Sequence, residues 1–251
     1  MQLKKLSAAL CAVSSLFVAG TAAAWESENG QHATSATVEL YSDYVFRGFS
    51  LSDNKPAIQG SFDYEHASGF YTGIWGTNNA SYISSGEIGV YAGFANEIMD
   101  TGIEYDLGVW RYIFPGASDL NNNEVYGALG YSYFTFSYAY AKNFEGNSET
   151  AHYYNIAFDY ELPFFGGVDF TAAYGYQDFS SSLKRVIFED ESSVGGYSDY
   201  YIALTKEFVG FDWTLAYTGV DSNGRKYARS DYWGKSSLAK DKFILSLSKT
   251  F

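Results

Sequence analysis

Cysteine is almost absent from this chain, and the single example, Cys11, lies within the first 24 residues. Residues 1–24 have the order of a secretory signal peptide: Lys4 and Lys5 come first, an apolar stretch follows, and residues 22–24 offer an A-x-A cleavage site. We therefore expect a cleaved leader and a mature chain of 227 residues without a thiol. Such a chain can form no disulfide and can hold no cysteine-ligated metal.

Other scarce features limit the function. No run of 18 apolar residues follows residue 24, which excludes a transmembrane helix. Without Lys4 and Lys5 the chain carries 14 basic and 29 acidic residues, a net charge of −15 that argues against nucleic acid as a partner. The three histidines, His32, His66 and His152, have no adjacent serine with an obvious acidic partner. We expect neither an enzyme nor a cofactor.

Proline is also rare, and Pro56, Pro115 and Pro163 all fall in or beside expected connections, where no ladder hydrogen bond is lost. Elsewhere apolar and polar side chains alternate, as in residues 102–113 and 166–177. A period of two predicts strands, and no segment after residue 25 shows a helical period.

Turn residues divide the chain into about twelve strands. They lie near 36–49, 57–65, 69–78, 86–96, 102–113, 123–131, 134–142, 151–161, 167–178, 198–207, 210–220 and 240–251. Short connections alternate with longer polar ones, which is typical of outer-membrane barrels. We predict an all-β protein, a single transmembrane antiparallel β-barrel of about 12 strands over residues 36–251, after an N-terminal tail at 25–35. Ten or fourteen strands are alternatives.

Aromatic residues are abundant, at 20% of the chain. A secreted soluble β-sandwich would also alternate, but one parity here is strongly apolar and aromatic while the other carries many carboxylates, which favours lipid outside and water inside. The expected location is therefore the bacterial outer membrane. The chain also ends like barrels recognised by the barrel-assembly machinery, with four apolar residues on one parity: Phe243, Leu245, Leu247 and Phe251.

Several strings resemble one family as an ordered set. S-D-Y-V-F-R-G-F-S-L-S-D at Ser42–Asp53 precedes P-A-I-Q-G-S-F-D-Y at Pro56–Tyr64 and S-G-F-Y-T-G-I-W-G at Ser68–Gly76; related strings follow at 87–94 and 105–116. Together they resemble the Gcw_chp family of uncharacterised proteobacterial outer-membrane proteins. The resemblance implies the outer membrane but no established activity, and it weakens in the later half, mainly at 179–197.

Charged residues on the polar parity cannot face lipid cheaply, since a charge at mid-membrane costs about 2–4 kcal/mol for basic groups and less for acids. We therefore expect them to line the lumen: Glu39, Asp43, Arg47, Asp63, Glu87, Glu104, Asp106, Asp159, Asp169 and Asp212. Two arrangements stay open. One is a cation-favouring aqueous path; the other is a plugged interior in which Arg47 pairs with Asp43 or a neighbouring carboxylate, or in which loop 179–197 folds inward.

The long connections hold further candidates. Glu189-Asp190-Glu191 could bind Ca²⁺ or could be a solvated acidic run, and we predict no metal site. The basic residues of loop 221–239 could contact lipopolysaccharide phosphates or form an ordinary hydrated loop: Arg225, Lys226, Arg229 and Lys235. Aromatic residues at strand ends predict an interfacial girdle, among them Tyr44, Phe46, Phe70, Trp213 and Trp233.

These observations favour a passive pore for small polar solutes, cationic or neutral. The alternative is a non-conducting barrel with a structural, adhesive or lipopolysaccharide-contacting role. The expected partners are outer-membrane lipids, lipopolysaccharide and the barrel-assembly machinery.

Overall fold

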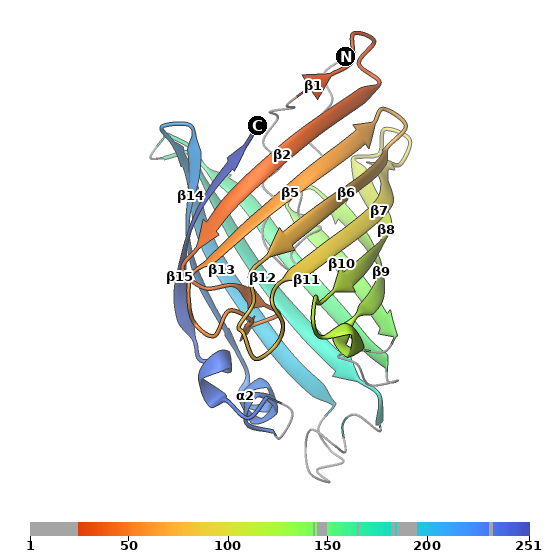
Figure 1. Cartoon of the computed structure of the whole chain (residues 1–251). Coiled ribbons are helices and arrows are strands. Elements are labelled where there is room, and N and C mark those ends of the chain that lie inside the picture. The colour runs from red at the N-terminus through yellow and green to blue at the C-terminus, as the bar shows by residue number, and fades with distance from the viewer. Residues whose placement is uncertain are drawn as a thin grey trace.

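Twelve antiparallel strands close into one barrel in the computed structural model (Figure 1). The structure describes residues 25–142, 144, 150–164, 166–181, 184, 195–230 and 233–251. The expected leader and Glu189-Asp190-Glu191 lie outside them. The barrel strands are β2 (His32–Tyr41), β5 (Ala57–His66), β6 (Phe70–Thr77), β7 (Glu87–Glu97), β8 (Ile103–Ile113), β9 (Asn122–Tyr131), β10 (Phe134–Lys142), β11 (Thr150–Leu162), β12 (Val168–Phe179), β13 (Gly196–Phe208), β14 (Phe211–Val220) and β15 (Lys242–Thr250).

Strand β2 closes the sheet, because it pairs with β5 on one side and with β15 on the other. The β2–β15 seam has five register pairs, from Ser246↔Tyr41 to Thr250↔Thr37, fewer than any other seam of the barrel. Closure gives each of the twelve barrel strands a hydrogen-bonded neighbour on both sides. The predicted twelve-stranded antiparallel barrel is confirmed.

The connections alternate in length as expected. Short turns include the two-residue hairpin at Val209-Gly210, where both φ angles are positive, +56° and +73°, as a type I′ turn requires. The end of the barrel with the short turns also holds β1 (Trp25–Glu26) and the end of β15, while the opposite end holds the long connections and α2 (Ser222–Arg229) (Figure 1).

Eleven strands fall within two residues of the predicted ranges, and the first does not. The expected strand 36–49 begins earlier, at His32, and ends at Tyr41, after which the chain leaves the wall. Within the segment expected to be a tail, β1 pairs with Thr34 and Ala33 of β2.

The sequence shows no helical period after residue 25, and the expectation that no helix forms there is wrong. Helix α2 begins after Asp221, whose carboxylate accepts a hydrogen bond from the backbone N–H of Gly224 at 2.8 Å and so caps the first turn. Two 3₁₀ turns accompany it, η2 (Ser118–Leu120) and η4 (Ser236–Ala239). None of the described helices is both long and apolar enough to cross a membrane.

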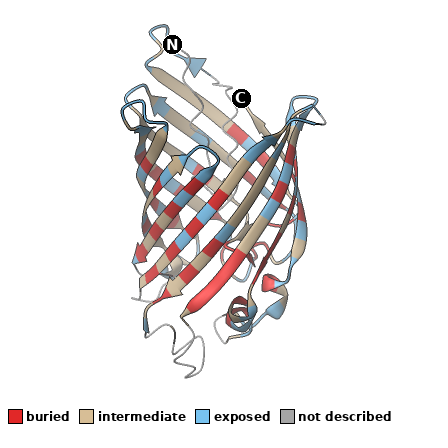
Figure 2. Cartoon of the chain, turned by 180° about the vertical axis from the view of Figure 1, so that it is seen from behind, coloured by how far each residue is buried: buried red, intermediate tan, exposed pale blue. Residues whose placement is uncertain are grey.

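Exposure alternates along each strand, and Figure 2 shows the resulting bands around the wall. In β8, Leu107 and Val109 are 60% and 53% exposed, whereas Asp106 and Trp110 are 8% exposed. The exposed set of the twelve strands is overwhelmingly apolar, and the buried set fills the interior. The barrel is therefore inverted relative to a water-soluble protein, whose exposed strand faces are polar.

Glycine and tyrosine are both abundant because they pair across neighbouring strands. Gly73 lies opposite Tyr91, and Gly108 lies opposite Tyr126. A Cβ atom at Gly73 would lie 2.5 Å from the Tyr91 ring, so the hydroxyl end of the ring occupies the space beside the glycine. Aromatic rings thereby cover the glycines of the inner wall and fill the space beside it.

Gly89→Ala is expected to lower the free energy of unfolding by about 1–3 kcal/mol, the usual range for overpacking. The new Cβ would lie 2.4 Å from Cζ2 of Trp110, and that ring cannot move freely because it stacks on Tyr91 with centroids 4.4 Å apart. Urea unfolding in lipid vesicles, followed by tryptophan fluorescence, measures the change. Gly130→Ala is the control, since its nearest neighbour is 3.6 Å away. Equal losses in both variants would contradict this packing role.

Candidate functional site

The connection between β2 and β5 folds into the barrel, and we call residues 42–56 the inward segment. It contains a short hairpin of β3 (Val45–Phe46) and β4 (Phe49–Ser50). The turn between them is Arg47-Gly48, with φ of +47° and +83°. A left-handed arginine is uncommon, and such backbone strain persists where surrounding contacts hold it in place.

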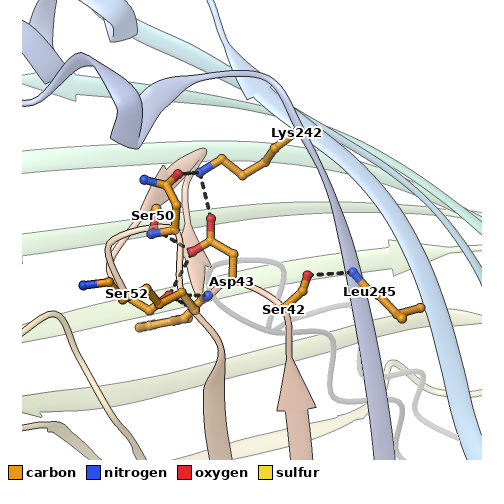
Figure 3. A network of polar contacts seen from close by, with 9 residues as sticks. Ser42, Asp43, Ser50, Ser52, Lys242 and Leu245 are labelled. Carbon is orange, nitrogen blue, oxygen red and sulfur yellow. Dashed lines mark hydrogen bonds and ion pairs between the residues drawn. The ribbon is translucent and has the colours of Figure 1, made fainter.

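Asp43 organises the base of the inward segment (Figure 3). Its carboxylate accepts hydrogen bonds from the hydroxyls of Ser50 at 2.6 Å and Ser52 at 2.8 Å. Lys242, at the start of β15, donates to the same carboxylate at 2.8 Å. One carboxylate therefore joins the two sides of the inward segment to the last strand.

Arg47 extends from the tip to the far wall. Its Nη2 donates to Glu124 of β9 at 2.7 Å, and its Nη1 donates to Gln177 of β12 at 2.8 Å. The guanidinium also lies 4.1 Å from the ring centroid of Tyr153 in β11. In the strand order these three strands lie across the barrel from β2 and β5, so the contact spans the interior.

The ion pair between Arg47 and Glu124 is buried, with side-chain exposures of 1% and 5%. Burial by itself would lower the pKa of Arg47, yet the adjacent Glu124 carboxylate holds that pKa above its usual value. The guanidinium therefore stays charged at the tip of the inward segment.

Apolar packing fixes the rest of the hairpin. A Cβ at Gly48 would lie 2.3 Å from Cγ1 of Val220, so the turn lies directly against the wall at the end of β14. Phe49 meets Tyr197 and Tyr227 edge-on, with centroids 5.1 and 5.3 Å apart. The inward segment is thus held by an ion pair, by the Asp43 network and by an aromatic cluster.

Two cavities of about 90 Å³ each border the inward segment. The first, which we call the loop chamber, lies at the end with the long connections and is lined mainly by aromatic residues, including Phe49, Tyr112 and Trp233. The second, the barrel chamber, is lined by wall residues and by the tip of the inward segment. Its polar lining includes Arg47, Gln59, Asn155, Thr171, Asp199 and Ser246.

The structure places the ten residues expected to line the lumen in the inward segment, on the wall strands and beside the short turns, where Asp169 is exposed. That they line an aqueous path stays a prediction. Asp43 and Arg47 lie in the inward segment, and Glu87 is 3% exposed at the start of β7. Four carboxylates of the wall accept hydrogen bonds from neighbouring hydroxyls: Glu39 from Tyr41, Asp63 from Tyr91, Asp106 from Tyr71, and Asp159 from Thr171. Glu104, Asp169 and Asp212 lie near the short turns.

Of the two pairings considered for Arg47, the one with Asp43 is not present, and the guanidinium pairs with another carboxylate of the interior. Arg47 pairs with Glu124, and Asp43 pairs with Lys242. Glu124, Gln177 and Asp199 were not among the expected residues, although each shares the inward parity of its strand with residues such as Tyr126, Gly175 and Tyr201. Their inward parity could therefore have identified all three as interior residues from the sequence.

Three of the aromatic residues expected in a girdle are instead interior. Tyr44 is 2% exposed and packs against Trp75 with centroids 5.8 Å apart, and Phe46 lines the loop chamber. The girdle expectation is wrong for both, because the chain leaves the wall after Tyr41. It is also wrong for Trp233, which lines the loop chamber and stacks on Phe49 with centroids 6.1 Å apart.

The histidines lie away from the inward segment. His32 and His66 are opposite each other in β2 and β5, and His32 contacts the hydroxyl of Tyr64 at 2.7 Å. His152 contacts Tyr138 at 2.8 Å, and His66 contacts Ser68 at 2.8 Å in an exposed turn. Within the described ranges, no three His, Cys, Asp or Glu residues are grouped so as to hold a metal ion.

The basic loop 221–239 faces carboxylates. Arg225 donates to both oxygens of Asp241 at 3.0 Å, and Lys235 pairs with Asp53 of the inward segment. Hydrogen bonds from Lys235 and Lys55 lower the pKa of Asp53, and Asp53 raises the pKa of Lys235. The contact between the two segments therefore persists until pH falls through the lowered pKa of Asp53.

The expected assembly signal lies on the outer face of β15 and beyond it. Phe243, Leu245 and Phe251 are more than half exposed, and Leu247 is half-buried. Phe251 exchanges backbone hydrogen bonds with Ala36, which extends the seam with β2. Recognition by the assembly machinery stays a prediction.

Comparison with known proteins identifies the fold. The family model described as "Bacterial protein of unknown function (Gcw_chp)" matches residues 26–251. A solved structure of the NanC porin covers 86% of this chain and 99% of its own, with 11% identity and a TM-score of 0.53. The KdgM porin covers 87% and 98%, with 11% identity and a TM-score of 0.48. No curated protein matches the chain by sequence.

Proposed function

The chain belongs to the bacterial Gcw_chp family of unknown function, and we propose that it is an outer-membrane channel for small polar solutes, cationic or neutral. The observation that carries this proposal is a closed barrel with an apolar outside and a polar, carboxylate-rich inside, narrowed by one segment of its own chain. The porin-like fold of the NanC relative is compatible with it.

The outer surface supports a membrane location. Large apolar side chains about half exposed to solvent surround the barrel, including Leu40, Ile58, Ile74, Val125 and Leu215. Aromatic rings contact one another at both ends of this belt, as in the pairs Phe134–Phe158 and Tyr217–Phe243, with centroids 5.1 and 5.0 Å apart. An apolar band between two aromatic rims is the usual exterior of a transmembrane barrel.

The inner surface supports selectivity for cations over anions. Wall carboxylates such as Asp63, Asp106 and Asp159 have hydroxyl partners, whereas the cations Arg47 and Lys242 are already paired with Glu124 and Asp43. The interior potential is therefore negative, which favours cations and tolerates neutral solutes.

Planar-bilayer recording of the purified, folded chain tests the proposal. We expect single-channel conductance in potassium chloride with K⁺ preferred over Cl⁻, and a smaller preference when Glu104, Asp106 and Asp212 are replaced by asparagine or glutamine. Absence of conductance at every voltage would contradict the proposal.

A non-conducting barrel is the second candidate function, because the inward segment crosses the interior and could block ion flow. Contacts with Glu124, with Lys242 and with the aromatic cluster around Phe49 hold it there. The same recordings separate the two candidates. A silent wild-type barrel that conducts only after the inward segment is shortened would favour the second.

A further inference from the structure

The barrel chamber carries polar groups without partners on side chains that are almost fully buried. Gln59 is 1% exposed, and neither its amide nitrogen nor its amide oxygen has a hydrogen-bond partner among the described residues. The Nε of Arg47 and the Oδ2 of Asp199 also have no hydrogen-bond partner among the described residues, and these two residues are 5% and 7% exposed. All three residues line this one cavity.

The other polar atoms of Arg47 and Asp199 have partners. Arg47 uses Nη1 and Nη2 on Gln177 and Glu124, and Asp199 uses Oδ1 to accept a hydrogen bond from Tyr153 at 3.1 Å. What stays open is therefore one N–H of a cation, one oxygen of a carboxylate and an amide that can both donate and accept. Buried polar groups of this kind normally have a partner, because an unpaired donor or acceptor has lost its hydrogen bonds to water without gaining others.

The open polar atoms of the lining decide the ligand class. Both carboxylate oxygens of Asp43 already accept hydrogen bonds, from Ser50, Ser52 and Lys242, so Asp43 offers no open atom to a ligand. The open atoms on charged side chains are the Nε–H of Arg47, whose guanidinium also pairs with Glu124, and the Oδ2 of Asp199. A small ligand that satisfies both needs an acceptor at one end and a donor at the other, and a carboxylate and an ammonium group make the strongest hydrogen bonds to such charged partners. A cavity of about 90 Å³ holds about six to nine waters at about 10–15 Å³ each, which is the size of a small α-amino acid.

We propose that the barrel chamber binds small zwitterions of the amino-acid type. The carboxylate accepts from Nε–H of Arg47 and from the amide of Gln59, and the ammonium group donates to Oδ2 of Asp199. This site deepens the proposed channel function, because it would name the solute class that pauses at the inward segment. Its apolar lining at Val45, Ala173 and Ile244 leaves room for a short aliphatic side chain.

Calorimetric titration of the folded full chain in detergent tests the site with four probes of similar size: L-alanine, lactate, isopropylammonium and glycerol. We expect saturable binding of L-alanine and at least about tenfold weaker binding of the other three, since each lacks one or both charged contacts. Asp199→Asn should weaken L-alanine binding by a similar factor and leave lactate unchanged. Gln59→Leu should weaken both L-alanine and lactate.

Asp63→Asn is the matched control, because Asp63 is a wall carboxylate paired with Tyr91 that does not line the chamber. It should leave alanine binding unchanged. If the folded wild type binds no alanine, or binds all four probes equally, the chamber holds solvent only and the inference fails.

Salt conductance of the same preparation separates this inference from the proposed function. Conductance without alanine binding overturns the site and leaves the channel standing. Alanine binding without conductance supports the site and overturns the channel.

Discussion

Arg47→Met is expected to destabilise the barrel by about 3–5 kcal/mol, the cost of leaving one member of a buried ion pair without its partner. Glu124 would be left without its cation at 5% side-chain exposure, and the far wall would lose its hydrogen bonds with the guanidinium, at 2.7 Å to Glu124 and 2.8 Å to Gln177. Urea unfolding of the reconstituted protein measures the loss. The inward segment would also lose its fixed position, so we expect noisier single-channel current.

The double variant Arg47→Met/Glu124→Leu is the decisive comparison. Replacing both partners removes the unpaired charge, and such replacements are often neutral in stability. We therefore expect the double variant to recover most of the stability lost by the single one. If the two variants unfold at the same urea concentration, water reaches Glu124 freely and the pair is not a structural link.

Shortening the inward segment is expected to raise the conductance several-fold. Replacing residues 44–53 with Gly-Ser-Gly would remove the hairpin and Arg47 together, and the two chambers would merge into one continuous lumen. The wall can tolerate this change, because β2 and β5 already pair up to Tyr41↔Ala57 and a short loop can join them. Ionic current through a wider constriction is larger, and selectivity between cations and anions falls with it.

Deletion of residues 25–30 is the matched control. These residues contain β1, which pairs with the start of β2, at the opposite end of that strand from the inward segment. Its conductance should equal that of the wild type. An unchanged current in the shortened variant would show that the inward segment does not limit ion flow, and the restriction would then have to be sought among the long connections.

The sequence predicted the strands of the barrel wall well, but it did not predict that residues 42–56 leave the wall and cross the interior. Strands such as β8 and β14 could be predicted because one parity faces outward and the other inward, and this alternation is local. The same alternation continues past Tyr41 through Asp43, Val45 and Arg47, which led to one long predicted strand. What ends the strand is a set of distant contacts, chiefly with Lys242 and Glu124, and no local pattern contains them.

The candidate site shows the same division. Inward parity predicted which strand residues are enclosed, including Glu39, Asp63 and Asp106, since parity needs no knowledge of neighbours. It could not show which charges meet, because Arg47 and Glu124 are 77 positions apart and their contact depends on the path of a loop. The turn at Arg47-Gly48 was the one local signal, since glycine favours positive φ.

The narrow seam between the first and last barrel strands constrains how the molecule is put together. Asp43 and Lys242 lie near opposite ends of the chain, so they can pair only after nearly the whole chain has been translocated. Their ion pair lies beside the β2–β15 seam, which has the fewest register pairs. We therefore expect the contact between the inward segment and the last strand to form late in assembly, together with the closing seam. The Asp43 carboxylate thus links the inward segment to the last strand beside the closing seam. We expect Asp43 variants to lower the yield of assembled barrel before they change its conductance.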